Sequence, residues 1–176
     1  SLYLSATLLL VFALSFWSGL RGLDGADTEV YLLFYQKLFD EGIIGIQSCQ
    51  SFEPLFCGLS LVAGYALGSS ILTQYFWVFL YFAVTLRAFS ILYGLAFPDN
   101  KFRFVAVLYF AFIAINYVDP QIVFFLTRQY VASAFLMLGF AKIADEKNPS
   151  INFLIATLIH LAAFPIALIA YIFSRR

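Results

Sequence analysis

The sequence carries little charge. Lys, Arg, Asp and Glu make up 11% of its 176 residues, and the formal net charge is zero. A soluble domain has roughly 25% charged residues, so this chain has too few to cover the surface of a soluble protein. It also lacks the concentrated basic face that nucleic acids require, so we expect no nucleic-acid partner.

Residues that bind metals or carry out redox chemistry are also scarce. Cys49 and Cys57 are the only cysteines and match no metal or redox motif, so we predict two unpaired thiols. His160 is the only histidine. We therefore predict no cofactor and no metal, although loop carboxylates are ligands that Mg²⁺ or Mn²⁺ accepts.

Long apolar runs dominate what is present. The chain is 63% hydrophobic, with a mean hydropathy of +0.92. Runs long enough for a bilayer core of about 30 Å predict an all-α, polytopic integral membrane protein with about five transmembrane helices. These spans are expected at residues 2–20, 71–97, 104–118, 130–144 and 151–173. Residues 54–68 are shorter, and predict a half-helix or an interfacial helix. Because the chain begins with Ser1, we expect residues 1–176 to be a single transmembrane domain from a longer protein.

Residues 21–53 form the one long polar segment. We predict an external loop, with a short helix over residues 30–39 lying at the membrane interface. Lys and Arg counts on the two sides are nearly equal, and the short basic loops at 98–103 and 142–150 favour the acidic segment outside. Arg175 and Arg176 argue against this orientation, because a fifth span ending at 173 places them outside as well.

Three polar features need a reason at a membrane boundary. Asp24 and Asp27 lie among small residues that let a ligand approach the backbone closely, although a solvated loop explains acids equally well. Arg128 is either a snorkelling anchor or a phosphate-binding fork. His160 falls within an apolar run, where it either pairs with another helix or moves a proton.

These landmarks, in this order, resemble the EpsG-type family of bacterial exopolysaccharide polymerases, which is related to the Wzy polymerases. The resemblance covers nearly the whole chain and matches the N-terminal half of the family pattern. Its pieces are Arg21-Gly22, Gly25-Ala26-Asp27-Thr28-x-x-Tyr31, Phe52-Glu53-Pro54-Leu55-Phe56, Thr127-Arg128-Gln129 with Ala132 and Ala134, and His160 to Pro165.

The resemblance implies a multi-pass enzyme of the bacterial inner membrane that polymerises polyprenyl-pyrophosphate-linked oligosaccharides, acting with membrane lipid and other polysaccharide export proteins. On this reading Asp27, supported by Asp24, is the base, and His160 is a further catalytic candidate. Arg128 and Arg21 hold pyrophosphate. Gln129, Glu53 and Tyr31 complete the substrate-binding set.

Other functions fit parts of the sequence. A transporter or flippase component would explain interrupted helices such as 54–68. A membrane-bound acyltransferase would use the single His160, but leaves the acidic segment unexplained. A non-catalytic assembly subunit would bind lipid-linked glycan without turnover.

Overall fold

The structure is a computed structural model that describes residues 2–22, 26–42, 53–98, 107, 110–111 and 127–174, and leaves out the side chains of residues 2–4, 19–22 and 26–27. Within these ranges the chain is helical and contains no strand. The predicted all-α fold is therefore confirmed for the described residues.

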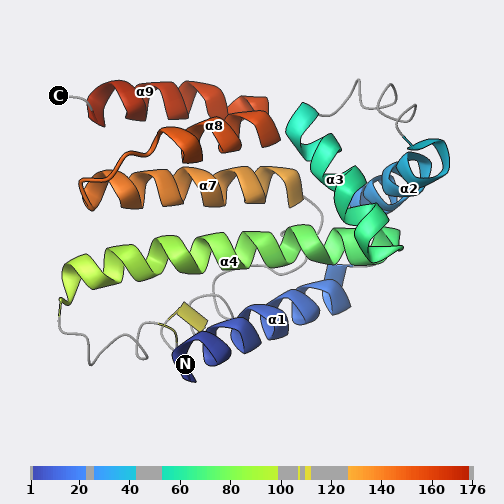
Figure 1. The fold of residues 1–176 in the computed structure, drawn as a ribbon, viewed down its shortest axis with the longest axis horizontal. Helices are drawn as coiled ribbons and strands as arrows, with labels where there is room; N and C mark the ends of the chain where they lie inside the picture. The colour runs from blue at the N-terminus through green and yellow to red at the C-terminus, as the bar shows by residue number, and fades with distance from the viewer. Residues whose placement is uncertain are drawn as a thin grey trace.

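The helices stack in layers with two further helices at one end (Figure 1). α9, α8, α7, α4 and α1 follow one another across the bundle, while α2 and α3 cover the end where α4 and α7 begin. The elements are α1 (Leu2–Gly22), α2 (Ala26–Glu41), α3 (Pro54–Leu67), α4 (Ser70–Ala96), α7 (Thr127–Ala144), α8 (Ser150–Ile159), the 3₁₀ turn η3 (Leu161–Ala163) and α9 (Phe164–Ser174).

One helix in the described part of the chain, α4, is long and apolar enough to cross a membrane, with 27 residues and a mean hydropathy of 1.7 over an 18-residue stretch. It matches the span predicted at 71–97. The span predicted at 104–118 falls outside the described residues except at positions 107, 110 and 111. The helices predicted at 2–20 and 130–144 are present as α1 and α7, but the number of membrane crossings stays a prediction.

Local sequence signals set the ends of α3. Pro54 occupies the first helical position, where its missing N–H costs nothing. The helix ends at Gly68, whose φ of 65° is the left-handed conformation that glycine adopts without strain. The 14 residues of α3 span about 21 Å at 1.5 Å per residue, so it is a short helix, as the sequence predicts.

The single span predicted at 151–173 is wrong. α8 ends at Ile159, His160 is extended (φ −150°, ψ 110°), and the chain continues through η3 into α9. Pro165 explains part of this break, because its ring would clash with the carbonyl of Leu161 in a continuous helix. The two resulting helices have 10 and 11 residues, each about half the thickness of a bilayer core.

α8 and α9 lie side by side and run in opposite directions (Figure 1). A shallow pocket between them is lined by Ser150 and Tyr171 near one end and by Thr157 and Phe164 near the other. The end of α9 at Ser174 lines a second pocket with Asn148 and Pro149, which precede α8. The pair is therefore a helical hairpin with His160 close to its tip.

The short helix predicted at 30–39 is confirmed as a helix that buries one face against the bundle, while Val30, Leu33 and Gln36 are exposed; its place at a membrane interface stays a prediction. α2 starts at Ala26, so Asp27 and Glu29 belong to its first turn and not to a loop. Tyr35 and Leu38 are 0% exposed. The ring of Tyr35 packs 6.4 Å, centroid to centroid, from Phe56, which lies 4.7 Å from the ring of Trp77.

Candidate functional site

The side chain of Glu53, at the start of α3, does not cap its own helix. Glu53 is the N-cap residue, with extended backbone (φ −69°, ψ 146°), yet its side chain makes no capping hydrogen bond to α3. Its carboxylate instead reaches residues of α7 and of the α8–η3 break. Because Pro54 supplies no N–H, the first turn of α3 has one fewer donor for a side-chain cap.

Arg128, in the first turn of α7, forms an ion pair with Glu53. Its Nη1 donates to Oε2 of Glu53 at 2.7 Å, and the two side chains are 19% and 17% exposed. α7 begins three residues before the predicted start at residue 130, which places Thr127, Arg128 and Gln129 in its first turn. The resulting contact joins residues 75 positions apart in the sequence.

His160 reaches the other carboxylate oxygen. Its Nδ1 lies 3.0 Å from Oε1 of Glu53, and the backbone N–H of Leu161 donates to the same oxygen at 2.9 Å. An ionised carboxylate only accepts hydrogen bonds, so Nδ1 of His160 is assigned as the protonated nitrogen. The break after α8 therefore delivers both an imidazole and a backbone N–H to one atom.

The pKa of the Glu53 carboxyl lies below its ordinary value of 4.5. Partial burial acts in the opposite direction, because it disfavours the charged form. It is outweighed by hydrogen bonds from the backbone N–H groups of Leu161 and Glu53 itself, by the hydrogen bond from His160, and by the positive charge of Arg128. Glu53 is therefore an anion at neutral pH, held by several donors.

A second polar cluster fixes the residue before Arg128. The hydroxyl of Tyr35 donates to Oε1 of Gln74 at 2.8 Å, and Nε2 of Gln74 donates to Oγ1 of Thr127 at 2.6 Å. All three side chains are 0% exposed. This chain of hydrogen bonds ties α2, α4 and the first turn of α7 together, and so sets the place from which Arg128 extends.

The other predicted site residues are not part of the Glu53 cluster as described. Asp24 lies outside the described residues, and only the backbones of Arg21 and Asp27 are described, at the end of α1 and the start of α2. Tyr31 is 8% exposed and packs 5.9 Å, ring to ring, from Phe56. Gln129 is exposed on α7. Asp27 is thus one helical turn from the Tyr31–Phe56 contact, and Glu53 is three residues from it.

Sequence reasoning missed Gln74 and the state of Cys57. Gln74 is an isolated amide in the first turns of an apolar helix, and that isolation is a detectable signal, because such a group needs a hydrogen-bonding partner. Cys57 is disulfide-bonded, so the prediction of unpaired thiols is wrong. Cys49 lies outside the described residues. Within the described ranges, no three His, Cys, Asp or Glu side chains gather as metal ligands do.

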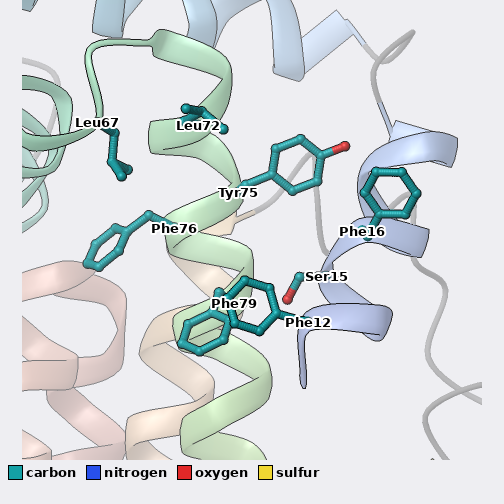
Figure 2. A pocket seen from close by; sticks show the side chains of 8 residues that line it. All are labelled: Phe12, Ser15, Phe16, Leu67, Leu72, Tyr75, Phe76 and Phe79. Atoms are coloured by element: carbon teal, nitrogen blue, oxygen red, sulfur yellow. The ribbon is translucent and has the colours of Figure 1, made fainter. Parts of the chain in front are cut away.

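An apolar groove lies on another face of the bundle, between α1 and α4 (Figure 2). Its volume is about 440 Å³. The hydroxyl of Ser15 donates to the backbone carbonyl of Val11, which leaves the groove almost entirely apolar. The lining residues are Phe12, Ser15 and Phe16 of α1, Leu67 of α3, and Leu72, Tyr75, Phe76 and Phe79 of α4.

The model of the EpsG family matches residues 5–176, nearly the whole chain. No curated protein and no solved structure matches.

Proposed function

The chain belongs to the EpsG family, and from this premise we propose that it is a membrane glycosyltransferase that polymerises polyprenyl-pyrophosphate-linked oligosaccharide repeats for exopolysaccharide, capsule or O-antigen. It would work as a multi-pass protein of the bacterial inner membrane, beside other polysaccharide export proteins. The growing glycan would leave its lipid carrier and join a sugar hydroxyl of the next lipid-linked unit.

One observation carries the proposal: Arg128, His160 and the Leu161 N–H converge on a single anionic group. Glycosyl transfer from a lipid pyrophosphate requires cations and hydrogen-bond donors where negative charge develops on the leaving group. An arginine fork suits phosphate oxygens, because its planar guanidinium presents several N–H donors. The cluster is polar, and it is partly exposed, so a substrate can reach it.

The reaction also needs a group that takes the acceptor proton. We assign this role to Asp27, supported by Asp24. The acceptor hydroxyl oxygen would bond to the anomeric carbon while its proton passes to the carboxylate. The bond from that carbon to the phosphate oxygen would break, and its electron pair would leave with the diphosphate. Arg21 would add a second cation.

Three predicted residues receive narrower roles. Gln129, exposed beside Arg128, is proposed to contact the glycan. Tyr31 is proposed to hold the start of α3 through Phe56, because it is buried. His160 is proposed to donate to the leaving diphosphate and to neutralise its charge.

Two further features support a lipid-linked substrate met at the outer side. The groove between α1 and α4 has the apolar, aromatic lining that a polyprenyl tail requires (Figure 2). Cys57 lies one turn into α3 from Glu53, and disulfides persist in oxidising compartments. This agrees with the expected outward orientation of the acidic segment.

The test compares Asp27→Asn and Arg128→Ala with a control, Lys142→Ala, in the full-length parent protein. Lys142 lies in the last turn of α7, far along the helix from Arg128. Polysaccharide chain length is read in cells lacking the native enzyme, at matched membrane levels. We expect polymer to fall by about a hundredfold or more in the first two variants and to be unchanged in the control. Normal polymer in all three would refute the proposal.

A transporter of the same lipid-linked substrate is the second candidate, because α8 and α9 form a broken helix pair of the kind that transporters use. Flux of labelled substrate into vesicles without any growth of the glycan would favour it over the polymerase.

A further inference from the structure

We propose that Glu53 occupies, in the resting protein, the position that a phosphoryl group of the substrate takes during the reaction. The site would then bind anions exchangeably, through Arg128, His160 and the backbone N–H of Leu161. When no substrate is bound, these donors would hold the carboxylate of Glu53. The identity of the ligand as a pyrophosphate rests on the proposed function; the exchange itself rests on the geometry.

The three donors come from separate elements and converge on two oxygens. Arg128 donates to Oε2 of Glu53 at 2.7 Å, while His160 and the Leu161 N–H reach Oε1 at 3.0 and 2.9 Å. Two oxygens of one phosphoryl group lie about as far apart as the two oxygens of a carboxylate. Donors placed around a carboxylate in this way therefore also fit one edge of a phosphate.

The site can be reached from outside. The side chains of Glu53, Arg128 and His160 are 17%, 19% and 22% exposed, whereas the nearby Gln74 is 0% exposed. An anion can thus approach the donors without opening the core of the bundle.

Glu53 is also able to leave. Its side chain makes no capping hydrogen bond to α3, so a rotation away from Arg128 costs α3 none of its own backbone hydrogen bonds. The first turn of α3 stays closed by the Cys57 N–H, which donates to the backbone carbonyl of Glu53 at 3.0 Å. The exchange therefore needs a side-chain rotation, with no movement of a helix.

If Glu53 competes with the ligand, removing its charge must strengthen binding. We would measure binding of inorganic pyrophosphate to the purified full-length protein by equilibrium dialysis. The control is Glu41→Gln, which removes the same charge at an exposed position. The Glu41 side chain is 42% exposed, and its carboxylate lies 3.9 Å from Nζ of Lys37, a weak ion pair. We expect Glu53→Gln to bind about tenfold tighter than the wild type, because one negative charge no longer opposes the ligand, and Glu41→Gln to bind like the wild type. Equal or weaker binding by Glu53→Gln would overturn the exchange.

A second measurement needs no variant, and so remains decisive where Glu53→Gln fails to fold. His160 is the only histidine of residues 1–176, so selective ¹⁵N-histidine labelling of the full-length protein gives one pair of imidazole signals from this region. We expect titration with inorganic pyrophosphate to move these signals saturably. Pyrophosphate that binds the wild type while leaving them unmoved would place the ligand elsewhere and overturn the proposal.

The two proposals fail separately. Tighter pyrophosphate binding by Glu53→Gln, together with normal polymer from both Asp27→Asn and Arg128→Ala, would keep the exchange and refute the polymerase. Loss of polymer from Arg128→Ala, without tighter binding by Glu53→Gln, would keep the polymerase and refute the exchange.

Discussion

The two polar clusters at this end of the bundle differ in charge and in access. Glu53, Arg128 and His160 are ionic or ionisable and about one-fifth exposed. Tyr35, Gln74 and Thr127 are neutral and sealed from solvent. They meet at consecutive residues, since Thr127 belongs to one and Arg128 to the other.

We infer from this difference that the neutral cluster positions the helices and that the ionic cluster binds ligands. A sealed neutral cluster exchanges nothing with solvent, so its hydrogen bonds hold α2, α4 and α7 in a fixed relation. A partly exposed ionic cluster can change partners, because water and ligands compete for its donors. Experiments that damage one cluster and spare the other test whether the division is real.

The largest effect on stability is expected from Gln74→Leu. This change removes the acceptor of the Tyr35 hydroxyl and one donor to the Thr127 hydroxyl. Both hydroxyl groups belong to side chains that are 0% exposed, so water cannot replace the lost partners. We expect a loss of about 3 kcal/mol in the free energy of unfolding, measured by thermal or denaturant unfolding in detergent. Gln36→Leu, at an exposed position of α2, is the control and should change stability little. Equal effects of the two variants would contradict a structural role for the sealed cluster.

A smaller effect is expected from Gly139→Ala, which disturbs the packing of α7 against α8. A Cβ at Gly139 would overlap the ring of Phe153, which is buried. The ring must move, at a cost of about 2 kcal/mol. Gly94→Ala meets nothing within 4 Å and should be neutral or slightly stabilising. The outcome that would count against this packing is an unchanged melting temperature for Gly139→Ala.

The smallest effect is the pH dependence of the ionic cluster. The pKa of Glu53 is lower in the folded protein than its ordinary 4.5, so the folded state binds this proton less readily than the unfolded state. The stability from Glu53 is therefore complete above its unfolded pKa and is lost as pH falls through the lower folded pKa. We expect the difference in melting temperature between wild type and Glu53→Gln to shrink from about pH 6 to pH 3. Gln74→Leu should keep the wild-type pH dependence, and a constant difference for Glu53→Gln would show that its charge contributes nothing.

The ends of α3 and the position of α4 were predictable from the sequence, because a short pattern sets each of them. Glu53-Pro54 marks the start of α3, and Gly68 marks its end. The run at 71–97 identifies α4. In each case the signal lies within a few residues of the feature that it sets.

The break at His160 and the pairing at Glu53 were not predictable in this way. Hydropathy continues through residues 151–173, and a window average does not register that the chain turns back. Glu53 meets Arg128 and His160 across 75 and 107 residues, separations that no local periodicity reports. The sequence named all three as candidates, but only the packing of α3, α7 and α8 shows that they meet.

In the proposed membrane orientation, the hairpin of α8 and α9 changes the expected parity of membrane crossings. A single span at 151–173 would carry the chain to the opposite face of the bilayer, whereas the hairpin returns Ser174 to the neighbourhood of Asn148 and Pro149. We therefore expect the two arginines that follow Ser174 in the sequence to count with Lys142 and Lys147 on the inner side. This placement would remove the objection that they raised to an outward acidic segment, and would give a clear positive-inside bias.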